Sequence, residues 1–306
     1  MNITLIGGNG FIGSHIVDRF LKNTNHSLVV FGRSKNKFAA IHDKVKYIYG
    51  DFEDVDLLRQ SILGADIVVH LLSTTVPAMA EMNPAYDVRS NLIGTINLLE
   101  EVARQNIKRF IYVSSGGTVY GNPRYIPMDE EHQLCPINSY GIVKSTIENY
   151  VKLYAKKYGF SYMIVRPSNP YGPRQGYKGA QGVISIFMHQ MLTNHPITIW
   201  GDGSAIRDYI YIDDVVDFFI KAILSQEQGV FNLGQGNACS INDIIKILEH
   251  VTSIKANITY KDVSISTVKE VVLDIKKSSR KLNWRPTTEL QIGITNHYEW
   301  MKKEKI

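Results

Sequence analysis

Three glycines near the start of the chain, spaced three residues apart, restrict its fold more than any other feature. Gly7, Gly10 and Gly13 follow an apolar run at 2–6 and open a segment of helical character at about 11–22. Glycines so placed permit a tight turn, let a pyrophosphate approach the backbone, and let the helix pack close to the strand. The first turn of that helix also favours bound phosphates, because its N–H groups are free and its dipole is positive there. Strand, glycine turn and helix in this order predict a dinucleotide-binding unit.

The rest of the first half repeats this alternation of apolar runs and helical segments. Largely apolar runs occur at 27–31, 45–49, 67–71 and 110–114, and the segment 91–105 between the last two carries leucine, isoleucine and valine at helical spacing. Continuous apolar strands joined by helices are typical of a parallel sheet that is covered on both faces. We therefore expect an α/β fold, a Rossmann-type doubly wound parallel sheet with right-handed crossovers.

The second half is less regular and predicts a smaller lobe. An amphipathic segment at 140–158 leads into an apolar strand at 162–166, and a loop rich in glycine and proline follows at 167–182. We expect that loop to face substrate. Because no linker separates the halves, we expect an NAD(P)-binding domain at 1–166 and a mainly substrate-binding C-terminal lobe at 167–306, interleaved with the first domain.

Composition excludes several classes of protein. The 306 residues are 44% hydrophobic and 21% charged, unlike a disordered chain. No apolar run approaches the roughly 18 to 20 residues of a membrane span, and no signal peptide is apparent. Two cysteines are too few for a disulfide framework, and the histidines show no metal-ligand spacing. The formal charge of +5 accompanies no nucleic-acid motif. We expect a cytoplasmic protein with no metal site and no nucleic-acid or membrane partner.

The residues after the second predicted strand bear on which dinucleotide binds. An NAD site normally places Asp or Glu there, to accept hydrogen bonds from the ribose hydroxyls. This chain has Gly32 and Arg33, with Lys35 and Lys37 close behind. A guanidinium pairs well with the extra phosphate of NADP(H), although the segment could also be a solvated basic loop. Asp51 could accept from the adenine amino group or simply form a turn. The sequence therefore leaves the choice between NADP(H) and NAD(H) open.

A tyrosine and a lysine stand one helical turn apart on one face of the helix predicted at 140–158. They are Tyr140 and Lys144, and they follow the strand that ends in Ser-Ser-Gly-Gly-Thr-Val-Tyr-Gly at 114–121. An ammonium beside a phenol favours the phenolate and should lower the tyrosine pKa from about 10. Such a tyrosine can give or take a proton at a sugar hydroxyl or carbonyl while a hydride moves to or from nicotinamide.

These motifs together resemble, over nearly the whole chain, the extended short-chain dehydrogenase/reductases that act on nucleotide sugars. The motifs are the glycine turn, Thr118-Val119-Tyr120-Gly121, Tyr140-x-x-x-Lys144, the run RPSNPYGPR at 166–174, and Arg207-Asp208-Tyr209 followed by Asp213-Asp214-Val215. The resemblance implies a Rossmann domain for NAD(P), a lobe that closes over a nucleoside-diphosphate sugar, and a homodimer formed through helices that include 91–105 and 140–158.

The resemblance also implies roles for particular residues. Tyr140 would be the acid/base, and Lys144 would activate it and bind the cofactor ribose. The hydroxyl that polarises the sugar oxygen usually stands at the position of Gly116, so Ser115 or Thr118 would have to supply it. The implied cofactor contacts are Gly7, Asn9, Gly10, Phe11, Ile12, Gly13, Arg33, Asp51, Phe52, Leu71, Asn91, Tyr140, Lys144 and Pro167. The implied substrate contacts are Asn169, Arg174, Arg207 and Lys269, the last in place of an arginine that the family often has.

Two enzyme functions fit these residues. In a 4-ketoreductase, NADPH delivers hydride to C4 of a keto-sugar nucleotide while Tyr140 protonates the oxygen. In a 4-epimerase of the UDP-glucose or UDP-GlcNAc type, tightly bound NAD removes that hydride and returns it to the opposite face. The lack of a carboxylate at Gly32 favours the reductase, whereas the Ser-Ser-Gly-Gly-Thr-Val-Tyr-Gly run is at least as typical of the epimerases.

Between these two we expect the reductase. Its expected substrate is a dTDP-4-keto-6-deoxyhexose or a related sugar, in the biosynthesis of a bacterial surface polysaccharide such as the O-antigen of lipopolysaccharide. A non-catalytic NAD(P)-sensing protein is a further alternative.

Overall fold

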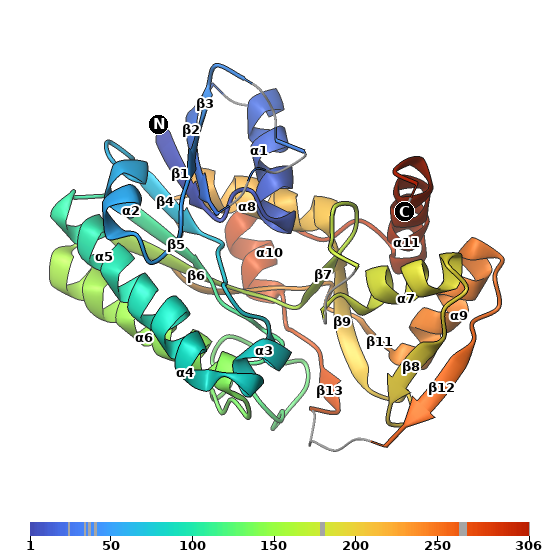
Figure 1. Ribbon diagram of the computed structural model, residues 1–306. Coiled ribbons are helices and arrows are strands. Elements are labelled where there is room, and N and C mark those ends of the chain that lie inside the picture. The colour runs from blue at the N-terminus through green and yellow to red at the C-terminus, as the bar shows by residue number, and fades with distance from the viewer. Residues whose placement is uncertain are drawn as a thin grey trace.

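A parallel sheet of seven strands forms the centre of the computed structural model, which describes residues 1–23, 25–33, 35, 38–39, 42–177, 181–262 and 268–305 (Figure 1). Lys37 therefore lies outside the described residues. The strand order is β10-β6-β5-β4-β1-β2-β3. The strands are β1 (Asn2–Ile6), β2 (Ser27–Gly32), β3 (Val45–Tyr49), β4 (Ile67–His70), β5 (Arg109–Val113), β6 (Ser161–Pro167) and β10 (Gly229–Leu233). The predicted Rossmann-type α/β fold is confirmed.

Helices cover both faces of this sheet, as continuous apolar strands require. On one face α1 (Phe11–Asn23) packs against α8 (Ile212–Leu224), with α10 (Lys276–Leu282) beside it (Figure 1). On the other face lie α2 (Val55–Ser61), α5 (Gly94–Arg104) and α6 (Ser139–Tyr158).

The helix predicted at 91–105 differs from its prediction at its start. Two short helices, α3 (Pro77–Met82) and α4 (Pro84–Asp87), lead into a π-helix, η1 (Val88–Ile93), which continues directly as α5. A π-turn widens the helix locally and often accompanies functional sites. Asn91, one of the predicted site residues, lies in this widened turn.

The second half builds a smaller lobe and also returns to the central sheet. Its strands are β7 (Asn169–Tyr171), β9 (Ile206–Tyr211), β11 (Ala238–Ser240) and β13 (Glu270–Val271) in one sheet, and β8 (Ile197–Trp200) with β12 (Ile258–Lys261) in another. Helices α7 (Val183–Leu192), α9 (Ile241–Thr252) and α11 (Leu290–Lys303) pack on them. Strand β10 pairs with β6, so this half supplies an edge of the central sheet. The division at residue 166 stays a prediction.

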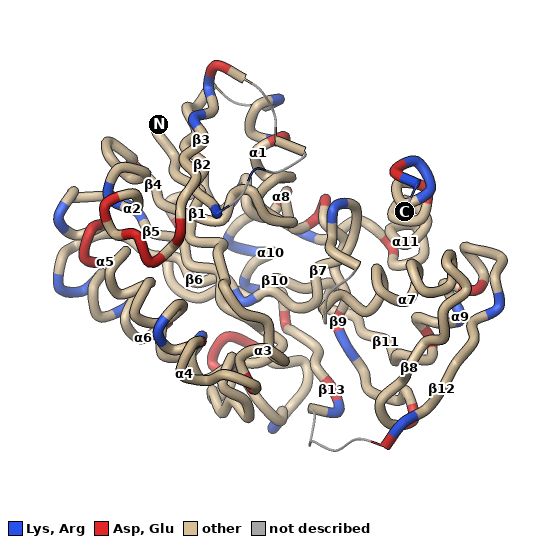
Figure 2. The backbone as a smooth tube through the Cα atoms, in the orientation of Figure 1, with Lys and Arg blue, Asp and Glu red and all other residues tan. Residues whose placement is uncertain are grey.

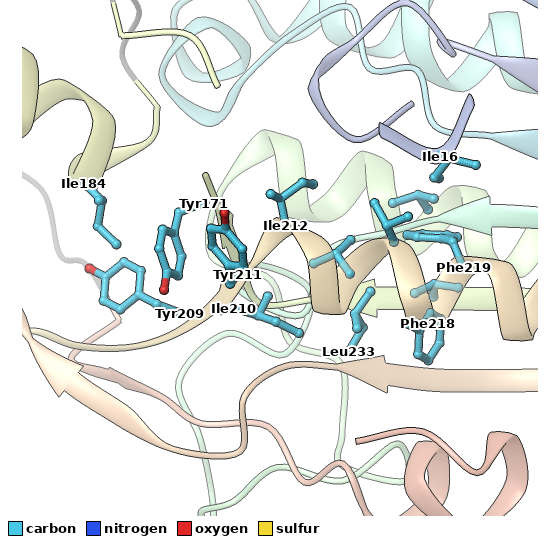
Figure 3. Packing of buried hydrophobic residues seen from close by; sticks show 14 of the residues in the cluster. Ile16, Tyr171, Ile184, Tyr209, Ile210, Tyr211, Ile212, Phe218, Phe219 and Leu233 are labelled. Atoms are coloured by element: carbon cyan, nitrogen blue, oxygen red, sulfur yellow. The ribbon is translucent and has the colours of Figure 1, made fainter. Parts of the chain in front are cut away.

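One hydrophobic core runs from the central sheet into the lobe. Consecutive residues of β9 and α8, from Tyr209 to Ile212, lie between Ile184 of α7 on one side and Phe218 and Phe219 on the other (Figure 3). Each large side chain buried in this way contributes about 1.5 to 3 kcal/mol. This shared packing holds the lobe against the carboxyl ends of the central strands.

Charged residues are spread over many elements rather than gathered in one basic stripe (Figure 2). A short acidic run, Asp51 to Asp56, stands out between β3 and the start of α2. Among the residues that the structure describes, no helix combines the length and apolarity needed to cross a membrane. Within the same residues, no group of three or more His, Cys, Asp or Glu side chains is placed to hold a metal ion.

Candidate active site

Two adjoining cavities lie where the carboxyl ends of the central strands meet the lobe. The first, the glycine cavity, has a volume of about 760 Å³ and the second, the lobe cavity, about 610 Å³. The predicted site residues that line the glycine cavity are Gly7, Gly10, Phe11, Ile12, Gly13, Leu71, Ser115, Tyr140, Lys144 and Pro167. Of the predicted substrate contacts, Asn169 and Arg207 line the lobe cavity.

The glycine turn has the shape that its spacing predicts. Gly7 has φ +86°, and a Cβ there would lie 2.7 Å from the backbone nitrogen of Leu72. A Cβ at Gly13 would lie 2.5 Å from the Cα of Gly8, so α1 packs directly on the turn. A Cβ at the exposed Gly10 would approach only the Gly7 carbonyl oxygen, at 3.2 Å. The turn therefore offers bare backbone at the start of α1, which fits the pyrophosphate of a dinucleotide.

Lys144 is buried under the glycine cavity. Its Nζ donates to the Val113 carbonyl at 3.0 Å and lies 5.6 Å from the centre of the Tyr140 ring. Removal from water lowers the pKa of Lys144 to about 8, although the carboxylates of Asp87 and Glu148 oppose the change. The ammonium is thus held beside the tyrosine, as the four-residue spacing predicts.

The expected lowering of the Tyr140 pKa is wrong. Burial raises the pKa of this phenol to about 12, and the opposing hydrogen bond with the Ser73 hydroxyl is the smaller influence. Loss of water around the phenolate outweighs the neighbouring charge that the sequence suggests. At neutral pH Tyr140 therefore holds its proton and is poised as a donor.

Of the two hydroxyls proposed to replace the one missing at Gly116, only Ser115 lines the glycine cavity. The Oγ1 of Thr118 is buried without a hydrogen-bond partner among the described residues, and Thr118 is not among the residues lining that cavity, so its catalytic role stays a prediction. Gly116 itself has no room for a side chain, because a Cβ would lie 2.6 Å from Cδ1 of Leu273 and 3.0 Å from the Arg166 carbonyl oxygen. The close packing of Leu273 thus explains the glycine.

A buried ion pair that the sequence analysis missed fixes α6 from behind. Arg166 of β6 donates to Glu148 through Nη2 at 2.6 Å and Nε at 3.0 Å, and both side chains are almost fully buried. Ser114 donates to the same carboxylate at 2.6 Å, and Arg166 also donates to Tyr120 at 2.9 Å. A carboxylate one turn beyond Lys144, on the helix face that also carries Ile147 and Val151, was the available signal. The pair ties the helix that carries Tyr140 to the end of the central sheet.

Asn91 orders the loop after β4 rather than lining either cavity. Its Oδ1 accepts from the Thr74 backbone N–H at 2.9 Å, and its Nδ2 donates to Thr75 at 3.0 Å and to Asp87 at 2.8 Å. The loop that it holds carries Ser73, which lines the glycine cavity beside Tyr140. The short polar run Ser-Thr-Thr after an apolar strand was the signal for Ser73.

The end of β2 carries no carboxylate. A Cβ at Gly32 would lie 2.9 Å from Nδ2 of Asn9, so the Asn9 amide stands beside the position where NAD sites usually place an acid. Arg33 is exposed, and the exposed Asp51 accepts from the Glu53 backbone N–H at 2.9 Å, as a turn residue does. Phe52 is buried and stacks on His70 with ring centres 5.1 Å apart. None of these predicted contacts is among the residues lining the glycine cavity.

In the lobe, two of the predicted substrate contacts lie away from the cavities. Arg174 pairs with Asp18 of α1 at 2.5 Å and covers the Phe38 ring, and its predicted role in holding substrate stays a prediction. Its guanidinium instead fastens the loop after β7 to the first helix. Lys269 is exposed and lines neither cavity.

Arg207 and Asn169 do face the lobe cavity and are held by backbone carbonyls. Arg207 Nη1 donates to the carbonyls of Ile206 at 2.8 Å and Lys269 at 3.2 Å, and Asn169 Nδ2 donates to that of Asp208 at 2.9 Å. Trp200 also lines this cavity and is 62% exposed. An aromatic face and a guanidinium suit a base and a phosphate group.

Comparisons with known proteins agree with this geometry. Residues 3–234 match the family described as NAD dependent epimerase/dehydratase. A Methanocaldococcus jannaschii protein provisionally named UDP-glucose 4-epimerase is 37% identical over 98% of both chains. The dTDP-4-dehydro-6-deoxyglucose reductase of Escherichia coli is 31% identical over 95% of both. The crystal structure of UDP-glucose 4-epimerase from Thermotoga maritima with UDP-glucose is 34% identical, covers 100% of both chains and has a TM-score of 0.94.

Proposed function

This chain belongs to the NAD dependent epimerase/dehydratase family, and from that premise we propose that it moves a hydride at C4 of a nucleoside-diphosphate hexose. The family resemblance predicted from the motifs is confirmed, and the chain is an enzyme of the group that includes nucleotide-sugar epimerases and reductases. The family is NAD dependent, and the glycine turn fits such a cofactor.

We assign the chemistry to residues that line the glycine cavity. These residues would hold a dinucleotide, which when bound would supply or accept the hydride. Tyr140, protonated at neutral pH, donates its proton to the sugar oxygen at C4 as the carbonyl becomes a hydroxyl. Lys144 holds the phenol and the cofactor ribose in place, and the Ser115 hydroxyl polarises the same sugar oxygen. Asn169 and Arg207 hold the nucleoside diphosphate in the lobe cavity.

As the specific reaction we propose reduction of a 4-keto sugar nucleotide, of the dTDP-4-keto-6-deoxyhexose type, by NADPH. The observation that carries this choice is the end of β2, where Asn9 stands against Gly32 and no carboxylate is present to hold the ribose of NAD. The exposed Arg33 suits the extra phosphate of NADP(H) and a cofactor that exchanges at each turnover. Production of a surface-polysaccharide sugar in the cytoplasm is the setting we propose.

4-Epimerisation of a UDP-hexose is the second candidate. It is favoured by the likeness to the Thermotoga maritima and Methanocaldococcus jannaschii proteins, both of which carry the name UDP-glucose 4-epimerase. The same Tyr140 would then remove and return a proton at the C4 hydroxyl. We do not retain a non-catalytic sensor, because Tyr140 and Lys144 both line the glycine cavity.

We also propose a homodimer formed through α5 and α6. Ile142 and Leu153 of α6 are 53% and 56% exposed, and Ile93, the last residue of η1 directly before α5, is 46% exposed. Exposed apolar side chains gathered on two adjacent helices are typical of a face that binds a partner.

The reaction is tested by measuring cofactor and turnover together. We expect the purified protein to oxidise NADPH stoichiometrically with dTDP-4-keto-6-deoxyglucose, and to carry no tightly bound NAD. Arg33→Ala should raise the KM for NADPH about tenfold and leave that for NADH unchanged, because an exposed charged hydrogen bond is lost. Lys35→Ala, also exposed, is the matched control. Tightly bound NAD with interconversion of UDP-glucose and UDP-galactose would instead establish the epimerase.

A further inference from the structure

The boundary between the glycine cavity and the lobe cavity is formed by four residues that line both. They are Ser168, Pro170, Gln175 and Gln181. A substrate whose C4 reaches Tyr140 and whose nucleoside lies in the lobe cavity must pass this boundary with its sugar. Of the two glutamines, Gln181 is exposed, whereas Gln175 is partly buried and fixed in place.

Three contacts hold the carboxamide of Gln175. Ser185 of α7 donates to its Oε1 at 2.6 Å, and its Nε2 donates to the Pro170 carbonyl at 2.9 Å. Gly182, with φ +99°, packs against the same group, since a Cβ there would lie 2.9 Å from the Cδ of Gln175. The amide oxygen of Gln175 therefore accepts from a donor, and its nitrogen donates to an acceptor.

A buried histidine fixes the direction of these hydrogen bonds. His297 of α11 is fully buried and lies with Nε2 2.9 Å from the Ser185 hydroxyl. Because that hydroxyl gives its hydrogen to Gln175, it must accept from an Nε2–H of His297. The His297 ring is stacked on Trp300 with centres 5.8 Å apart. The Gln175 oxygen thus always faces Ser185, and its nitrogen always faces Pro170.

The amide keeps one hydrogen and one lone pair after these contacts. A sugar hydroxyl both donates and accepts, so it matches this remaining capacity. A diphosphate only accepts and pairs better with a guanidinium such as Arg207. We propose that Gln175 is the specificity-determining residue that reads a ring hydroxyl of the hexose other than the one at C4. Ser185 and His297 act as positioning residues through it. This inference rests on the proposed function.

The test compares the affinities of two probes that differ only in the sugar. Binding of UDP-glucose and of UDP is measured by calorimetry for the wild type and for Gln175→Ala, and dTDP-glucose with dTDP serves in the same way. We expect Gln175→Ala to weaken the sugar nucleotide about tenfold and to leave the free diphosphate unchanged, because a neutral hydrogen bond to the sugar is lost. Gln190→Ala, a change at a glutamine of α7 that lines neither cavity, should change neither affinity.

Two further variants separate recognition from folding. Gln175→Glu keeps the shape and accepts from Ser185 but lacks the N–H, so it should weaken UDP-glucose at least as much as Gln175→Ala does. Ser185→Ala should give a smaller loss, about threefold, again confined to the sugar nucleotide. Equal losses for UDP-glucose and UDP, or no loss for either, would overturn the assignment of Gln175. A wild type that binds neither sugar nucleotide would overturn the proposed function and this inference with it.

Discussion

The glycine cavity and the lobe cavity adjoin, yet they are built in different ways. The glycine cavity is shaped by backbone at the ends of parallel strands, and the buried pair of Glu148 and Arg166 fixes its catalytic helix. The lobe cavity is shaped by side chains from separate segments, among them the largely exposed Trp200. Chemistry shared by a family can therefore stay on the sheet while the side chains of the lobe change with the substrate.

This division predicts that substitutions in the two cavities alter different kinetic constants. The largest effect should come from Tyr140→Phe, which removes the proton donor and should lower kcat about a thousandfold. Affinity for the dinucleotide should hardly change, because the glycine turn and Lys144 remain. Turnover at saturating substrate and binding of NADPH by fluorescence measure the two quantities.

Tyr209→Phe is the matched control in the lobe cavity. Its hydroxyl is buried without a partner among the described residues, so its loss should leave kcat unchanged. Unaltered turnover in Tyr140→Phe would contradict the proposal that the reaction takes place in the glycine cavity. A comparable fall in kcat for Tyr209→Phe would show that catalysis and substrate binding are not separated between the two cavities.

A smaller effect is expected for the charge in the lobe cavity. Arg207→Ala should weaken binding of UDP or dTDP by about tenfold to a hundredfold, because charge-assisted hydrogen bonds to the diphosphate are lost. Affinity for NADPH should not change. Lys269→Ala tests the exposed lysine that the sequence suggested as a second anion ligand, and it should have little effect. Similar losses of affinity for UDP or dTDP in the two variants would show that Lys269 also binds the diphosphate.

The glycine cavity was predictable because its main residues lie only a few positions apart in the sequence, where local geometry decides how they are placed. Spacing alone places Gly7, Gly10 and Gly13 in one turn, and Tyr140 and Lys144 on one helix face. The error concerned the direction of the Tyr140 pKa, since burial depends on packing that no local spacing reveals. For the same reason Glu148 was missed, although it lies on the same helix.

The lobe cavity was predictable only in part. Asn169 and Arg207 face it, but Arg174 is drawn to Asp18, a residue 156 positions away in the chain. Gln175 was missed because its orientation depends on Ser185 and on His297, which is 112 positions beyond Ser185. Contacts over such separations come from tertiary packing, which a single sequence does not specify.

The regions around the two cavities can also be compared by their response to acid, because each contains a buried neutral histidine. His70 lies on β4 behind the glycine cavity, and burial lowers its pKa to about 3. His297 lies on α11 behind the lobe cavity, and burial lowers its pKa to about 4. Below about pH 6.5 the unfolded chain binds protons at both imidazoles while the folded chain does not. The free energy of unfolding should therefore fall as the pH drops below 6.5, until about pH 4 for His297 and about pH 3 for His70.

Each histidine contributes at most about 1.4 kcal/mol per pH unit to this loss. Urea unfolding between pH 7 and pH 5 measures it, since the ordinary carboxylates titrate mainly below that range. His297→Gln can still donate to Ser185 but cannot gain a proton, so the free energy of unfolding of this variant should fall less steeply with acid than that of the wild type. An unchanged slope would mean that His297 becomes protonated in the folded lobe. Acid would then affect the hydrogen bonds that hold Gln175 in the folded protein, whereas His70 would stay neutral.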